Sequence, residues 1–247
     1  MVTAFERKRQ FYRFLRSKVG CLHFLHDLFW RVNRYILTSP VLSAAWKRCF
    51  ERNRLSLPVI TVVDLRLDIV DTILFPGVKQ DGFDEDANLQ DLIFLLQLSK
   101  ARKASRILEV GTYRAKTTYA MHLNRPEAFI CSYDVRKVDS DYRNILENTG
   151  NVRLQINSFA ADADALRDQR PFDLIFIDGS HRLEDVLADS ALAFEILSNE
   201  GIVVWHDYRK SGYWSPDLQV PEALSHLQER FVISAVKDTN CAVYIRG

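Results

Sequence analysis

The chain has 247 residues, of which 47% are hydrophobic and 26% charged, and its formal net charge is +1 at pH 7. These values are ordinary for a globular protein, and the length allows one sizeable core with an appendage rather than two equal domains. No uninterrupted apolar stretch reaches about 18 residues, which excludes a membrane-spanning helix, and basic residues interrupt every apolar run near the start, so no signal peptide is expected. The four cysteines form no CxxC pair, so we expect reduced thiols in a cytoplasmic protein.

The charge is distributed unevenly along the chain. Residues 1–54 contain 12 Lys and Arg against 3 Asp and Glu, whereas the remainder contains 21 against 29. Apolar side chains recur in the basic part at helical spacing: Leu22, Leu25, Leu28 and Phe29. We therefore predict a basic amphipathic helical extension over residues 1–55. It could lie on an anionic membrane surface, pack on a partner subunit in a homo-oligomer, or fold over its own domain.

Nucleic-acid binding is not expected. The positive charge is confined to the extension, and no recognised nucleic-acid-binding motif accompanies it.

Residues 56–247 are predicted to form one α/β domain. A β-rich segment opens it, and a helix within residues 84–104 follows, with acidic residues at its start and basic residues at its end, as the helix dipole favours. Strands and helices then alternate, which predicts a doubly wound, Rossmann-like, mostly parallel seven-stranded sheet with helices on both faces. The short "KDTN" predicts that the last two strands pair as an antiparallel C-terminal hairpin. The predicted strands are Arg106–Val110, Phe129–Asp134, Val152–Ile156, Leu174–Asp178, Ile202–His206, Phe231–Val236 and Ala242–Arg246.

The stretch "SRILEVGTYRAKTTYAM" places a glycine between the first of these strands and a helix. A phosphate-binding loop requires a glycine directly before its lysine, where Ala115 stands. A dinucleotide fingerprint requires glycines at the second and fifth positions after Gly111, where Tyr113 and Lys116 stand. The loop therefore fits neither motif.

Two acidic residues remain at this edge of the predicted sheet. Glu109 lies two positions before Gly111, and Asp134 ends the next strand. A carboxylate at the tip of the second strand is placed to accept both hydroxyls of a ribose. Glu109 is expected under the loop, near a cationic or amino group. The alternative is that both are surface carboxylates at strand ends.

A second polar cluster follows the fourth and fifth strands of the series. Asp178 precedes "GSH", which contains His181, and His206 and Asp207 end the next strand. Because adjacent parallel strands bring their carboxyl ends together, these four side chains should converge on one side of the crevice. The alternative is structural: His181 caps a helix, and His206 is a buried, hydrogen-bonded histidine.

Four motifs in series resemble those of the class I S-adenosylmethionine-dependent methyltransferases: "ILEVGTYRAKTT", "CSYDV", "FDLIFIDGSHRLEDVLAD" and "LSNEGIVVWHDY". The likeness covers about residues 80–247 and is nearest to small-molecule and sugar O-methyltransferases with catechol-type motifs. It implies S-adenosylmethionine as cofactor. The cofactor-binding residues that it implies are Glu109, Gly111, Thr112, Tyr113, Ala115, Asp134, Asn157 and Ser158. Ala115 stands where the family commonly has glycine.

The resemblance also implies a catalytic site formed by Asp178, His181 and His206. In metal-dependent relatives the positions of Asp178, His206 and Asp207 bind Mg²⁺, which lowers the pKa of the acceptor hydroxyl, and His181 falls at the position of a general base. Imidazole is a poor ligand for Mg²⁺, so Mn²⁺, Fe²⁺ or Zn²⁺ is favoured if His206 binds a metal. Otherwise Asp178 and Asp207 hold Mg²⁺ alone, or no metal takes part.

The predicted function is O-methylation of a hydroxyl on a small molecule or glycan. Tyr208, Tyr213 and Trp214 fall in a long aromatic segment that is expected to face the acceptor, and the alternative is a packed surface loop. The alternative is a non-catalytic protein of the same fold that acts through its basic extension at a membrane or oligomer interface.

Overall fold

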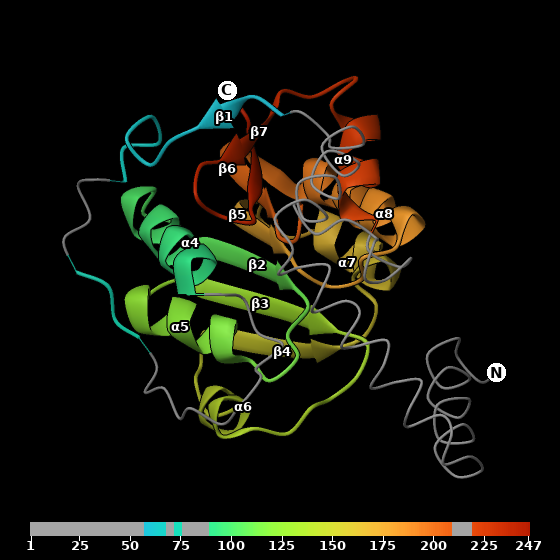
Figure 1. Ribbon diagram of the computed structural model, residues 1–247. Coiled ribbons are helices and arrows are strands. Elements are labelled where there is room, and N and C mark those ends of the chain that lie inside the picture. Colours follow the sequence, from blue (N-terminus) through green and yellow to red (C-terminus); the bar gives the residue numbers. More distant parts are fainter. Residues whose placement is uncertain (1–56, 68–71, 76–88, 209–218) are drawn as a thin grey trace, which may run out of the picture. The chain divides into compact units, whose positions relative to one another are not determined.

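The computed structural model describes residues 57–67, 72–75, 89–208 and 219–247 (Figure 1). The predicted helical extension, Tyr213 and Trp214 lie outside these ranges. Residues 55–247 form one compact unit. None of the helices in the described ranges has the length and apolar character needed to cross a membrane.

The described elements alternate between strands and helices from residue 89 onward. They are β1 (Val59–Ile60), α4 (Leu89–Ala101), β2 (Arg106–Val110), α5 (Lys116–Asn124), β3 (Phe129–Asp134), α6 (Asp141–Leu146), β4 (Val152–Ile156), the 3-10 helix η1 (Phe159–Asp162), α7 (Ala163–Arg167), β5 (Phe172–Ile177), α8 (Leu183–Ile196), β6 (Leu197–Trp205), α9 (Val220–Leu227), β7 (Ile233–Val236) and β8 (Ala242–Ile245).

The strands form one sheet in the order β1-β7-β8-β6-β5-β2-β3-β4. All neighbours are parallel except β8, which is antiparallel to both β6 and β7. This confirms the predicted Rossmann-like, mostly parallel sheet with its C-terminal hairpin. The seven predicted strands are all present, and the short β1 adds an eighth.

The segment predicted to be β-rich contributes only the two residues of β1 among those described. The chain turns immediately after this strand, because the carboxylate of Asp64 accepts a hydrogen bond from the backbone N–H of Thr61 at 2.8 Å. A side chain that bonds the backbone locally favours a turn over continued strand pairing.

Helices cover both faces of the sheet (Figure 1). The apolar residues of α4, α5 and α6 pack with one set of strand side chains, and those of α7, α8 and α9 pack with the other set. Successive side chains of a strand point to opposite faces, so Leu108 and Val110 of β2 belong to the second core while Ile107 belongs to the first. Glu109 therefore lies on the α4–α6 side of the sheet.

The order of the strands reverses between β2 and β5. From β2 the chain winds outward through β3 and β4, and from β5 it winds in the opposite direction through β6. Ligands of open α/β sheets bind at the carboxyl ends of the strands at such a switch point. The two predicted polar clusters follow β2–β3 and β5–β6, so both lie at this edge.

Candidate active site

The loop after β2 is held tightly against the end of β5. Gly111 has φ +105°, and its backbone N–H donates to the carbonyl of Tyr133 at 2.8 Å. A Cβ atom at this position would lie 2.1 Å from the carbonyl oxygen of Asp178. Only glycine satisfies both the left-handed conformation and this close approach. The glycine thus allows the loop after β2 to pack closely against the end of β5, across the switch point.

The same loop continues through two further left-handed residues, Tyr113 (φ 44°) and Ala115 (φ 61°), before α5 begins. Alanine in this conformation is uncommon, which explains why the family resemblance predicts glycine here. The backbone N–H of Ala115 donates to the carbonyl of Thr112 at 2.7 Å and closes the turn.

Asp134, at the tip of β3, hydrogen-bonds to the loop that follows β2. Its Oδ2 accepts from the backbone N–H of Tyr113 at 2.7 Å, and its Oδ1 accepts from Arg136 N–H at 3.1 Å. The side chain is partly exposed, and each carboxylate oxygen can accept a further bond. The carboxylate can therefore bind two hydroxyls while it holds the loop.

Glu109 lies beneath the loop and is fully buried. Its Oε2 bonds the hydroxyls of Thr118 in α5 and Ser132 in β3, and Ser132 lies 2.7 Å from the hydroxyl of Thr112. Burial raises the pKa of Glu109 to about 8, although the two hydroxyl bonds act in the opposite direction. Its hydrogen-bond partners among the described residues are hydroxyl groups.

Asn157 and Ser158 follow β4, next to the tip of β3. Asn157 is exposed; its Nδ2 donates to Asp162 at 2.6 Å, and its Oδ1 accepts from the backbone N–H of Ser158 at 2.9 Å. Asn157 and Ser158 lie at the same edge of the sheet as Asp134, because Asp134 pairs in register with Ile156, the residue before Asn157.

His206 follows β6 and is surrounded by carboxylates. Its Nδ1 lies 2.9 Å from Oδ1 of Asp178 and 3.2 Å from Oδ1 of Asp207, and its Nε2 lies 2.9 Å from Oδ2 of Asp91. Burial alone would lower its pKa, but the bonds to Asp178 and Asp91 outweigh burial and raise the pKa to about 10. The ring is therefore an imidazolium at neutral pH, and both of its nitrogens are occupied by carboxylates.

Asp91 and Asn240 belong to this cluster although the sequence did not single them out. Asp91 lies on the buried side of α4, and its Oδ1 accepts from the backbone N–H of Asn240 at 2.7 Å. The side chain of Asn240, in the β7–β8 turn, donates to Oδ1 of Asp207 at 2.7 Å. A carboxylate within the apolar stripe of the predicted helix was the signal that could have identified Asp91.

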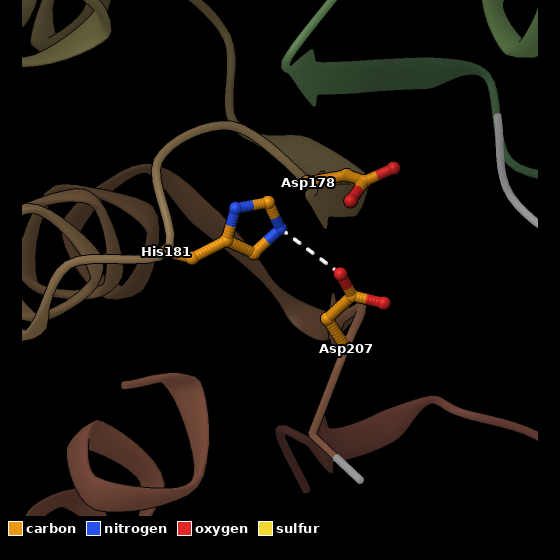
Figure 2. A group of neighbouring side chains, drawn as sticks. All are labelled: Asp178, His181 and Asp207. Atoms are coloured by element: carbon orange, nitrogen blue, oxygen red, sulfur yellow. Dashed lines mark ion pairs between the residues drawn. The ribbon is translucent and has the colours of Figure 1, made fainter. Parts of the chain in front are cut away.

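Asp178, His181 and Asp207 form the group whose ligand atoms converge, all within 4.8 Å of one another. Figure 2 shows the imidazole of His181 facing Asp207, with Asp178 beside them. Nε2 of His181 lies 3.0 Å from Oδ2 of Asp207, but no acceptor among the described residues meets this shielded nitrogen at the angle of a hydrogen bond. Two carboxylates and an unsatisfied nitrogen fit a divalent cation or an acceptor hydroxyl.

His181 is placed by the backbone rather than by a role in capping α8. Arg182 is the N-cap residue, and the hydroxyl of Ser180 donates to Asp185 at 2.6 Å. The carbonyl of His181 accepts from the backbone N–H of Gln219 at 2.7 Å, and Oε1 of Gln219 accepts from Leu183 N–H at 3.1 Å. Gln219 therefore fixes both sides of the turn that carries His181, a role with no sequence signal.

A family model and several solved structures are similar to this chain. Residues 92–208 match a family model described as a methyltransferase domain. The methyltransferase PaMTH1 of Podospora anserina, solved with SAH, is 16% identical with a TM-score of 0.57, covering 84% of this chain and 96% of that chain. No curated protein matches the sequence.

Two O-methyltransferases have the same fold. The enzyme of Bacillus cereus, in complex with SAH, is 16% identical with a TM-score of 0.52, covering 65% of this chain and 82% of its own. TomG of Streptomyces achromogenes, in complex with SAM, is 16% identical with a TM-score of 0.51, covering 64% and 80%.

The matched region contains the loop after β2 and the acid at the tip of β3, and the strand order is that of a Rossmann-like methyltransferase fold. Residues 92–208 thus match a methyltransferase domain, and the chain shares the fold of enzymes solved with SAM or SAH, in line with the resemblance of its motifs.

Proposed function

We propose that the protein transfers a methyl group from S-adenosylmethionine to a hydroxyl of a small molecule or glycan. One observation carries the proposal: Asp178, His181 and Asp207 converge beside the Gly111 loop, at the switch point where such sheets bind ligands. A nucleophile-activating group thus lies next to the crevice that the family uses for the methyl donor.

The residues of the crevice fit S-adenosylmethionine, which when bound supplies an activated methyl group. Asp134 presents carboxylate oxygens to the ribose hydroxyls, while the backbone of Gly111, Thr112 and Tyr113 lines the adjoining part of the cofactor. Ala115 has a small side chain at this tight turn, and Glu109 binds Thr118 of α5 beneath it. Asn157 and Ser158 are proposed at the adenine end.

On the acceptor side, we assign His181 as the group that removes the hydroxyl proton. Its Nε2 has no hydrogen bond among the described residues and faces Asp207, whose carboxylate stabilises the imidazolium that forms. The remaining requirement is alignment, because proximity and orientation alone contribute several kcal/mol to a group transfer.

Asp178 and Asp207 are the ligands we propose for Mg²⁺ or Mn²⁺, and a bound cation lowers the pKa of a hydroxyl that it contacts. His206 was predicted as a third ligand and a catalytic residue. Because both of its nitrogens contact carboxylates, we assign it the role of holding Asp178 and Asp207 in place.

We keep the partners predicted for residues 1–55 as proposals: peripheral contact with an anionic membrane surface, or a homo-oligomer interface, in a cytoplasmic protein. The charge of this segment supports both.

The test is a methyl-transfer assay with S-adenosylmethionine, a panel of phenolic, polyketide and sugar acceptors, and added Mn²⁺ or EDTA. Wild type is compared with His181→Ala and with His226→Ala, an exposed histidine of α9. We expect His181→Ala to lower kcat by about 10²–10⁴-fold and His226→Ala to have no effect. Equal rates for wild type and His181→Ala on an accepted substrate would contradict the assignment.

A further inference from the structure

The carboxylates of Asp178 and Asp207 are joined by a hydrogen-bond network that starts from a single side chain of α4. Asp91 is 2% exposed, and its two oxygens point to different partners. Oδ2 lies 2.9 Å from Nε2 of His206, and Oδ1 accepts from the backbone N–H of Asn240 at 2.7 Å. Asp91 thus contacts both the end of β6 and the β7–β8 turn.

Each of these partners extends to one carboxylate of the candidate site. Nδ1 of His206 lies 2.9 Å from Oδ1 of Asp178, and Nδ2 of Asn240 donates to Oδ1 of Asp207 at 2.7 Å. The two branches therefore run from Asp91 to Asp178 through His206, and from Asp91 to Asp207 through Asn240. The second oxygen of Asp207, Oδ2, lies 3.0 Å from Nε2 of His181.

We propose that Asp91 is a positioning residue that fixes the orientation of both carboxylates through His206 and Asn240. The role of the two carboxylates rests on the proposed function, but the hydrogen-bond network is a property of the protein without ligands. Side chains that hydrogen-bond to ligating or catalytic groups fix the orientation of those groups, and their removal typically costs 10–100-fold in metal affinity or activity.

Backbone contacts explain why the orientation of Asp207 depends on residues outside β5 and β6. Asp207 has φ 59°, a left-handed conformation that its own strand does not favour. The backbone N–H of the following residue, Tyr208, donates to the carbonyl of Asn240 at 3.2 Å. The β7–β8 turn therefore holds both the main chain and the side chain at Asp207, and Asp91 holds the turn.

A purely structural role for Asp91 is the competing explanation, and it makes a different prediction. If Asp91 only stabilises buried polar groups, its removal lowers the melting temperature and weakens every property of the domain together. If it positions the carboxylates, its removal acts on the Asp178–Asp207 side and leaves the Asp134 side of the crevice unchanged.

The experiment compares wild type with Asp91→Asn, Asp91→Ala and Asn240→Ala. Ser99→Ala is the matched control, because Ser99 is a buried polar residue of the same helix whose hydroxyl donates to the carbonyl of Leu96 at 2.8 Å. Four quantities are measured. They are Mn²⁺ affinity from the electron paramagnetic resonance of free Mn²⁺, S-adenosylmethionine affinity by calorimetry, the melting temperature by thermal unfolding, and the ring N–H proton signals of His206 in the metal-free protein by NMR, assigned with a His206→Gln variant.

We expect both Asp91 variants to weaken Mn²⁺ binding at least tenfold, and to shift or abolish the His206 Nε2–H signal, with S-adenosylmethionine affinity within twofold of wild type. Asn240→Ala is expected to weaken Mn²⁺ binding while keeping the Nε2–H signal, because the Asp91–His206 bond remains. This second variant tests the branch to Asp207 even if Asp91→Ala fails to fold.

Unchanged Mn²⁺ affinity and an unchanged His206 signal in Asp91→Asn would overturn the proposal. A parallel loss of Mn²⁺ affinity, S-adenosylmethionine affinity and melting temperature would also overturn it, since this is the structural pattern. If the wild type binds no Mn²⁺, the NMR signals of His206 alone test the branch from Asp91 to Asp178. Unchanged signals in Asp91→Asn would then overturn the proposal. If it binds no S-adenosylmethionine, the proposed function fails while the positioning test still stands.

Discussion

Nδ1 of His206 lies 2.9 Å from Oδ1 of Asp178 and thereby links the carboxyl ends of β6 and β5. The same ring contacts Asp91 through Nε2, so one buried imidazolium stands between carboxylates from a helix and from the neighbouring strand. Asp91 is buried and Asp178 is partly exposed, so loss of the ring would leave above all the Asp91 carboxylate as an uncompensated buried charge. His206 is therefore central to the stability of the site.

Replacing His206 by alanine is predicted to lower the free energy of unfolding by about 3–5 kcal/mol. The reason is the loss of the cation that compensates Asp91 and Asp178. Urea unfolding near pH 6 measures the effect, and His226→Ala, at an exposed position of α9, serves as the control. A loss close to that of the control would show that the carboxylates do not depend on the ring.

The stabilisation by His206 is predicted to fall as the pH rises. The pKa is raised from 6.5 to about 10 on folding, so the folded state holds this proton more tightly than the unfolded state. The contribution is complete below pH 6.5 and is lost as the pH rises through about 10. The difference in unfolding free energy between wild type and His206→Ala should shrink across this window. A difference that grows with pH would contradict the assigned charge.

Glu109 is predicted to be protonated at neutral pH. Because burial raises its pKa from 4.5 to about 8, the folded state binds a proton that the unfolded state has released. Stability should decrease by up to about 1.4 kcal/mol per pH unit between pH 4.5 and 8, and level off above that range. Glu109→Gln keeps a neutral polar side chain and removes this dependence.

The measurement for Glu109 is the unfolding free energy of wild type and Glu109→Gln across that pH range. The variant should become progressively more stable than wild type as the pH rises. Glu200→Gln, at an exposed position in β6, controls for the loss of a surface charge. Parallel curves for wild type and Glu109→Gln would show that Glu109 is ionised in the folded protein.

Gly111→Ala is predicted to destabilise the domain by roughly 3 kcal/mol or more and to remove S-adenosylmethionine binding. The added methyl group would lie 2.1 Å from the carbonyl oxygen of Asp178, and the backbone has φ +105°. Thermal unfolding and calorimetry measure the two effects. Gly150→Ala is the matched control, because its Cβ would meet nothing within 4 Å. Normal binding by Gly111→Ala would contradict the assigned loop.

The sequence predicted those parts of the fold that depend on local patterns. Apolar runs that alternate with helices predicted all seven expected strands. Polar residues at the strand ends predicted that Asp134 and Asp178 lie at one edge of the sheet. The two-residue β1 was not predicted as a separate strand, because its pairing with β7 depends on a partner far along the chain.

The contacts of the site were less accessible to prediction. Asp91 and Asn240 lie 149 positions apart, and no local pattern indicates that they meet. Asn240 is an ordinary turn residue, and Asp91 differs from an ordinary acid of a first helical turn only by its place in the apolar stripe of α4. The charge of His206 depends on three carboxylates that the fold brings together, so its role could not be separated from that of a metal ligand by spacing alone.

Above all, we propose that the Gly111 loop and Asp134 bind S-adenosylmethionine. Calorimetric titration of S-adenosylmethionine into wild type, Asp134→Ala and Asp139→Ala tests it most directly. Asp139 is an exposed acid in the segment between β3 and α6, whereas Asp134 accepts the hydrogen bond from Tyr113. We predict micromolar binding by wild type and Asp139→Ala, and binding weakened at least tenfold in Asp134→Ala. No binding by the wild type, or equal binding by Asp134→Ala, would contradict the account.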